Sequence, residues 1–277
     1  MASLAVRRAK DSTIKAISTA FAVFALFLLA WILFTLIQKG LPALGLNVFT
    51  RITLPPGQNG GLLNAIVGSL IQIAIAMLIG TPIGLMAGTF LAENGKTTKV
   101  GHVARFVNDI LLSAPSILVG LFVYTFLVAP LGGFSGWAGA IALAILVIPV
   151  VVRTTEDMLN LVPVGLREAA FALGAPQWKV VMLVTWRAAQ AGIVTGILLA
   201  IARAAGETAP LLFTSLGNNS WSLDLSRPMA SLPIAIYQYA GSPFDDWVSL
   251  AWAGALLITV GVLVLNILAR LFLARTK

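Results

Sequence analysis

Residues 153–210 read RTTEDMLNLVPVGLREAAFALGAPQWKVVMLVTWRAAQAGIVTGILLAIARAAGETAP. We expect its first part, 153–189, to form the longest charged loop of a chain otherwise built of apolar runs. An apolar helix that contains Arg203 and Glu207 follows directly. A loop able to dock a soluble partner would thus lead into a membrane segment that carries charge.

The composition of the whole chain indicates a polytopic membrane protein. Hydrophobic residues make up 59% of the 277 residues and charged residues 10%, whereas soluble domains carry about 25% charged residues. Six spans of about 20–25 residues leave little room for a separate soluble domain. We therefore expect residues 1–277 to form a single transmembrane domain.

The apolar runs predict an all-α fold with six transmembrane helices. Their approximate bounds are 17–37, 62–92, 106–130, 137–152, 191–216 and 247–273. In the third span, Ser113, Pro115 and Ser116 predict an interruption. At its entry, Arg105 and Asp109 are spaced for an i,i+4 ion pair.

Glycines recur on one face of the second predicted span. Gly80, Gly84 and Gly88 are four residues apart, a spacing that lets another helix approach closely. Tolerated flexibility is an equally good explanation of the same glycines.

The distribution of cations predicts the orientation and explains the net charge of +8 without nucleic acid. The cations of one side are Arg7, Arg8, Lys10, Lys15, Lys96, Lys99, Arg105, Arg153, Arg167, Lys179, Arg187, Arg270, Arg275 and Lys277. The other side receives Lys39, Arg51 and Arg227. We expect both termini to be cytoplasmic.

Residues for covalent chemistry are missing from the sequence. The chain has no cysteine and one histidine, His102, so we expect no catalytic triad and no metal site. Residues 95–97 read GKT, but Phe90 stands where a phosphate-binding loop needs glycine. The sequence predicts no cofactor in this chain, and any ATP would be hydrolysed by another one.

Within the charged loop, apolar and small residues follow Pro163 at helical spacing: Leu166, Ala169, Ala170, Leu173 and Gly174. Arg167, Glu168, Gln177 and Lys179 give the region a polar side. A short amphipathic helix of this kind can lie in a partner's groove or on the lipid surface.

The run Glu168-Ala169-Ala170-x3-Gly174 resembles the EAA loop of type I ABC importer permeases. The resemblance implies a docking helix, with Arg167, Glu168, Ala169, Ala170 and Gly174 facing an ATPase subunit that binds ATP and Mg²⁺. Val184-Thr185-Trp186-Arg187 stands in place of the family's I-x-L-P. That departure leaves the entry into the fifth span open.

Residues 203–214, RAAGETAPLLFT, resemble permeases of bacterial phosphate-specific ABC importers. The fragments at 64–69, 81–85, 115–124 and 192–196 resemble them as well. The resemblance implies a bacterial inner-membrane protein, a sister permease subunit, two ATPase subunits, an external phosphate-binding protein and inorganic phosphate as substrate. It also implies that Arg203, Glu207 and Thr208 line the substrate path.

The predicted substrate path depends on Arg203 and Glu207. An ionisable residue within the membrane costs about 2.5 kcal/mol or more unless it is paired or faces water. An arginine can donate two hydrogen bonds to an oxyanion, and Glu207 would neutralise it while the path is empty. The alternatives are a permanent salt bridge, another oxyanion such as sulfate or molybdate, a non-transporting scaffold, and an ion-coupled carrier with Glu207 as proton carrier.

Overall fold

The computed structural model describes residues 4–275, except the side chains of residues 4–7, 9 and 272–275. Arg7, Arg275 and Lys277 of the predicted charge pattern therefore lie outside the described side chains. Within this range the secondary structure is helical apart from one isolated bridge between Leu216 and Met229. The predicted all-α fold is confirmed.

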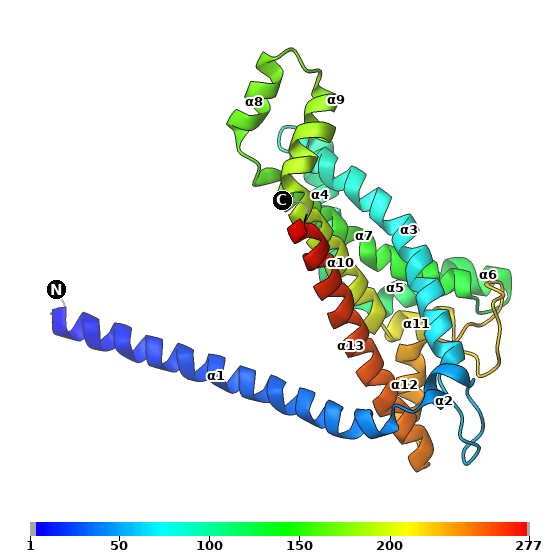
Figure 1. Cartoon of the computed structure of the whole chain (residues 1–277). Coiled ribbons are helices and arrows are strands. Elements are labelled where there is room, and N and C mark those ends of the chain that lie inside the picture. Colours follow the sequence, from blue (N-terminus) through cyan, green and yellow to red (C-terminus); the bar gives the residue numbers. More distant parts are fainter. Residues whose placement is uncertain (1–3, 276–277) are drawn as a thin grey trace.

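Among the described residues, five helical segments are long and apolar enough to cross a membrane, and Figure 1 shows their arrangement. They are α1 (Leu4–Ala43), α3 (Leu63–Glu93), α7 (Gly136–Asn160), the segment Gln177–Gly206 that ends with α10 (Trp186–Gly206), and α13 (Asp245–Arg275). Shorter elements are α2 (Leu46–Thr50), α8 (Val164–Ala172), α9 (Gln177–Lys179), the π-helical η2 (Val180–Thr185), α11 (Ala209–Thr214) and α12 (Leu232–Ala240).

The third predicted span is a bent pair of helices rather than a straight helix. Residues Lys99–Ser113, which form α4, meet residues Ser116–Leu131 at an angle of 103°. The second arm comprises α5 (Ser116–Val123), the π-helical η1 (Tyr124–Val128) and α6 (Ala129–Leu131). The bend lies at Pro115, where a missing N–H and a fixed φ interrupt the helix. The interruption predicted from Ser113, Pro115 and Ser116 is thus confirmed.

Helix α7 forms the centre of the bundle. In its most apolar 18-residue window, 72% of the residues are buried, compared with 6% in α1. Gly80, Gly84 and Gly88 of α3 face it. A Cβ atom at these positions would lie 2.9, 2.6 and 2.7 Å from side-chain atoms of Val147, Val151 and Thr155. The three glycines therefore permit a backbone approach that any larger residue would prevent.

Helix α7 is longer than the predicted fourth span, and the prediction of a loop from Arg153 is wrong. The helix continues to Asn160 because Thr155, Glu156 and Leu159 are buried in this stretch. Likewise, α10 begins at Trp186 rather than near residue 191.

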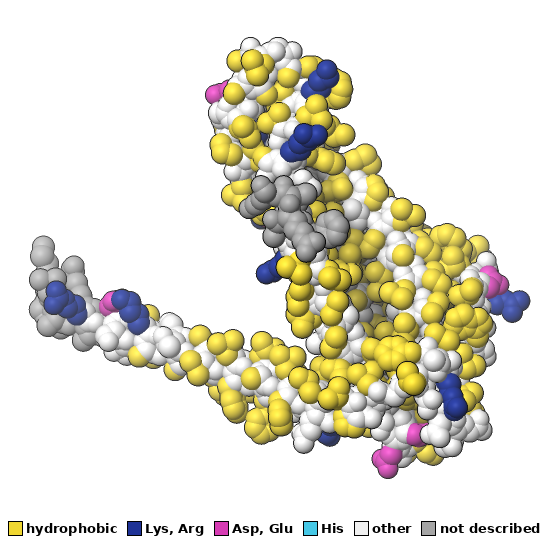
Figure 2. All heavy atoms as spheres, viewed as in Figure 1, with side chains coloured by type: hydrophobic (Ala, Val, Ile, Leu, Met, Phe, Trp, Pro, Cys, Tyr) yellow, Lys and Arg dark blue, Asp and Glu magenta, His cyan; other side chains and the backbone are white. Residues whose placement is uncertain are grey.

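A helix also lies within the predicted outer loop 217–246. Helix α12 packs against α13 and α3, and the N–H of its first residue, Leu232, donates to Ser69 Oγ at 2.7 Å. By contrast, α1 extends away from the bundle (Figure 1). Figure 2 shows hydrophobic side chains along the visible face of α1 and over the middle of the bundle.

Candidate functional site

Helix α8 is delimited by two residues with special backbone geometry. Pro163 precedes it with φ −56° and ψ 137°, which pre-orients the chain for helix entry. After the helix, Gly174 adopts φ +78°, a left-handed conformation that glycine reaches without steric cost. The N–H groups of Gly174 and Ala175 donate to the carbonyls of Phe171 and Ala170 at 2.9 and 3.3 Å. This geometry turns the chain back toward α9.

The residues of α8 are open to the surroundings. Val164–Ala172 contains no buried residue, and Leu166, Phe171 and Leu173 are 44%, 48% and 88% exposed. Of the predicted docking residues, Glu168, Ala169 and Gly174 are exposed and Ala170 is half-buried. Figure 1 places α8 at one end of the molecule, beyond the long helices. Exposed apolar side chains beside small residues are typical of an interaction surface.

Arg167, also predicted to face a partner, points into the chain instead. Its Nη1 donates to Glu93 Oε1 of α3 at 2.8 Å, and its Nη2 donates to the carbonyl of Leu159 at 2.7 Å. The side chains of Arg167 and Glu93 are 18% and 14% exposed. The structure assigns Arg167 to the support of α8 rather than to its exposed face.

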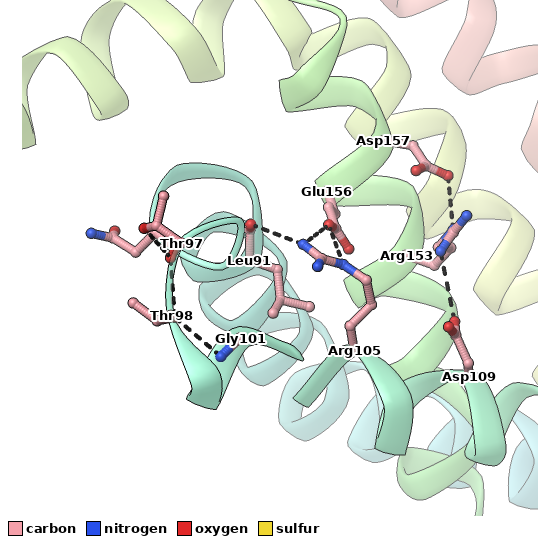
Figure 3. A network of polar contacts seen from close by, with 10 residues as sticks. Leu91, Thr97, Thr98, Gly101, Arg105, Asp109, Arg153, Glu156 and Asp157 are labelled. Atoms are coloured by element: carbon pink, nitrogen blue, oxygen red, sulfur yellow. Dashed lines mark hydrogen bonds and ion pairs between the residues drawn. The ribbon is translucent and has the colours of Figure 1, made fainter. Parts of the chain in front are cut away.

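A second charged cluster joins α4 to α7 (Figure 3). Arg105 binds Glu156 at 2.6 Å, while Arg153 contacts Asp109 at 3.6 Å and Asp157 at 3.2 Å. The predicted pair Arg105–Asp109 is therefore wrong. Glu156 is only 7% exposed, and a buried carboxylate needs a cationic partner, which Arg105 supplies across the helix interface.

Arg203 and Glu207 lie at the break between α10 and α11, and the prediction of a continuous helix through them is wrong. Helix α10 ends at Gly206, and Glu207 has φ −74° and ψ 119°. The cause is Pro210, which has no N–H to bond the carbonyl four residues earlier. Arg203 Nε still donates to Glu207 Oε1 at 3.4 Å.

The surroundings of this pair suit a charged group. Arg203 lies in the last turn of α10, where a cation interacts favourably with the helix dipole. The side chains of Arg203 and Glu207 are 33% and 15% exposed, and Thr208 is half-buried beside them. The guanidinium keeps donors that Glu207 does not occupy, and a planar set of such donors has the geometry that an oxyanion requires.

Metal chemistry has no visible support in the described part of the chain. Among the described side chains, no three His, Asp or Glu residues lie together as a metal ion would require. The arrangement around Arg203 offers hydrogen-bond donors and one carboxylate, which suits binding and release rather than bond cleavage.

Comparison with known proteins finds a family whose model matches most of this chain. Residues 80–277 match the family described as "Binding-protein-dependent transport system inner membrane component". The chain is 59% identical to the phosphate transport system permease protein PstA of Pasteurella multocida (strain Pm70), covering 96% of this chain and 95% of that protein. It is also 59% identical to the protein of the same name from Haemophilus influenzae, with 92% and 90% covered.

The fold has a counterpart among solved structures. A chain of the MetNI methionine ABC transporter in an inward-facing conformation superposes with a TM-score of 0.63 at 18% sequence identity. The match covers 78% of this chain and 94% of that one. The predicted all-α permease fold is thereby confirmed.

Proposed function

Since the chain belongs to the family of binding-protein-dependent transport system inner membrane components, we propose that it is the permease subunit of an ATP-driven importer of inorganic phosphate. It forms half of the translocation path, and a sister permease subunit forms the other half. Two ATPase subunits bind ATP and Mg²⁺ on the cytoplasmic side. An external binding protein delivers phosphate from the other side.

The exposure of α8 is the observation that carries this proposal. The helix presents Glu168 and Ala169 with half-exposed Leu166 and Phe171, at the end of the molecule where the chain links α7 to α10. An apolar surface with one carboxylate fits a groove of a soluble ATPase subunit. Docking there would convert ATP-driven movement into movement of the helices.

Phosphate is proposed as the substrate for two reasons. The two relatives compared above carry phosphate transport in their names, and Arg203 offers a planar set of donors that matches a tetrahedral oxyanion. Glu207 neutralises the guanidinium while the path is empty and releases it to phosphate in transit. The hydrogen bond from Arg203 Nε to Glu207 Oε1 is long, at 3.4 Å, so replacing the Glu207 oxygen with a phosphate oxygen costs little free energy. Thr208 follows Glu207 directly in the chain and so lies beside this binding position.

The bacterial inner membrane is the proposed location, with both termini cytoplasmic. The cations near α4, α8 and α9 then lie on the cytoplasmic side, as the positive-inside rule requires. Lys39, Arg51 and Arg227 lie outside under the same assignment.

The test is purification of the chain in mild detergent from its host, with identification of the proteins that accompany it. We expect an ATPase subunit and a second permease. Gly174→Val should release the ATPase, because a β-branched residue resists φ +78°. Gly132→Val is the matched control, since Gly132 also has positive φ, +74°, but lies in the turn after α6. Recovery of the chain alone, from a preparation that still transports phosphate, would contradict the proposal.

A further inference from the structure

Two side-chain contacts tie the chain on both sides of the α8–α9 region to the same end of α3. We name residues 161–185 the coupling segment. Near its start, Arg167 donates to Glu93 at 2.8 Å. Directly after its end, Trp186 Nε1 donates to Thr89 Oγ1 at 3.1 Å. Thr89 and Glu93 are four residues apart and so lie on one face of α3.

Glu93 occupies an unfavourable position for a carboxylate. It is the last residue of α3, where the helix dipole repels negative charge, and its side chain is only 14% exposed. Arg167 offsets both costs and at the same time reaches the carbonyl of Leu159 in α7. A locally unfavourable residue that is compensated from a distant segment is expected at functional positions.

The hydroxyl of Thr89 is oriented to accept the hydrogen bond from Trp186. Its hydroxyl donates to the carbonyl of Leu85 at 2.7 Å, which leaves an oxygen lone pair for the indole N–H of Trp186. Trp186 also packs against the buried cluster that contains Ala92, Leu159 and Ala189. Trp186, which stands where the family's I-x-L-P pattern has leucine, thus fixes the start of α10 to α3.

Between the two ties, the surface is hollowed. An open groove of about 570 Å³ is lined by Thr89, Phe90, Glu93 and Asn94 on one side and by Gln177, Trp178, Val181 and Met182 on the other. The coupling segment can therefore shift against α3 without compressing a filled interface. Force between the two would pass through the hydrogen-bonded contacts at Thr89 and Glu93.

From these observations we propose that Thr89 and Glu93 are positioning residues that transmit displacement of the coupling segment to α3. Helix α3 passes the displacement on to α7 through the close contacts at Gly80, Gly84 and Gly88. The inference rests on the proposed function, since it requires an ATPase subunit that moves α8.

The experiment uses the complete complex in vesicles, with ATP hydrolysis and phosphate import measured together. The variants are Glu93→Gln and the double variant Glu93→Gln/Thr89→Val. Loss of a hydrogen bond to a charged group, about 1.5–3 kcal/mol, corresponds to a roughly 10- to 100-fold change. We expect import per ATP hydrolysed to fall at least about tenfold, while the ATPase subunits stay bound.

Two further variants separate coupling from stability. Arg167→Lys keeps the charge and should restore part of the coupling that Arg167→Gln loses. Lys96→Gln removes an exposed cation three residues beyond Glu93 and should leave import per ATP unchanged.

Two results would overturn the inference. One is unchanged import per ATP in Glu93→Gln/Thr89→Val. The other is loss of the ATPase subunits from Arg167→Gln, which would make Arg167 a docking contact. If the wild-type complex itself fails to import phosphate with ATP, the proposed function fails instead, so the two failures are distinguishable.

Discussion

Arg105 of α4 donates from Nε and Nη2 to the same oxygen, Oε1, of Glu156 in α7, at 2.9 and 2.6 Å (Figure 3). Its Nη2 also reaches the carbonyl of Leu91 in α3 at 3.4 Å. One guanidinium thus joins three helices at the end of the bundle that carries the coupling segment. Glu156 is 7% exposed, so Arg105 supplies the hydrogen bonds that solvent cannot.

Arg105→Gln should therefore destabilise the chain by about 3 kcal/mol, because it leaves a buried carboxylate without a cation. Arg153→Gln is the matched control. Its side chain is 46% exposed, and an exposed ion pair contributes about 1 kcal/mol or less. Thermal unfolding in mild detergent measures both. Equal melting temperatures for the two variants would contradict the assignment of Glu156 as a buried charge.

Gly84→Ala should destabilise the contact between α3 and α7. The added Cβ would lie 2.6 Å from Val151 Cβ, and overpacking of this kind costs about 1–3 kcal/mol. Gly261→Ala in α13 meets no atom within 4 Å and should be neutral or slightly stabilising. The comparison is made by melting temperature, and a stable Gly84→Ala would show that the glycine face is not needed for close packing.

Arg203→Gln should lower ATP-driven phosphate import about 10- to 100-fold at equal expression, because a charged donor to the anion is lost. Arg227→Gln serves as the control, since Arg227 is 75% exposed and pairs with Asp224 at 3.2 Å. Uptake of labelled phosphate into cells measures the effect. Normal uptake by Arg203→Gln would make the Arg203–Glu207 pair a structural salt bridge.

Alkaline pH should destabilise the region around α12 through Tyr239, which lies outside the membrane-spanning helices. Burial raises the pKa of its phenol above the ordinary value of 10.0, although a hydrogen bond with Thr53 acts in the opposite direction. A raised folded-state pKa gives a stabilising contribution that is complete below pH 10.0 and is lost as the pH rises through the folded value.

Tyr239→Phe should consequently lose less stability than the wild type above pH 10.0. Tyr237→Phe, at a side chain that is 65% exposed, should behave like the wild type. Melting temperatures between neutral and alkaline pH test this, and identical slopes for Tyr239→Phe and the wild type would refute it.

Much of the fold is predictable from apolar runs and breakers. The spans around α3 and α13 follow from hydrophobic length, and the bend at Pro115 follows from proline chemistry. Pro210 carries the same signal, since it has no N–H to bond the carbonyl of Gly206, and α10 ends at Gly206. Helix α12 likewise begins directly after Ser231 and has Pro233 in its first turn, a typical helix start.

What the sequence could not provide is the choice of partners between distant segments. Arg105 has Asp109 at i+4, but its partner is Glu156, 51 residues away, because burial selects the carboxylate that most needs a cation. Glu156 and Thr155 were missed because the charges at 153–157 resemble a loop. The spacing of Val152, Thr155 and Leu159, all buried, was the signal that the helix continues. The inward turn of Arg167 likewise depends on Glu93 and Leu159.

We propose above that ATP hydrolysis by a partner drives phosphate through this chain. The most direct measurement is uptake of labelled phosphate into vesicles that contain the purified complex, with ATP or a non-hydrolysable analogue on the ATPase side and the external binding protein on the other. We expect uptake that requires hydrolysis, resists uncouplers, and is not displaced by excess sulfate or molybdate. Uptake that persists without ATP and collapses with an uncoupler would contradict it and make Glu207 a proton carrier.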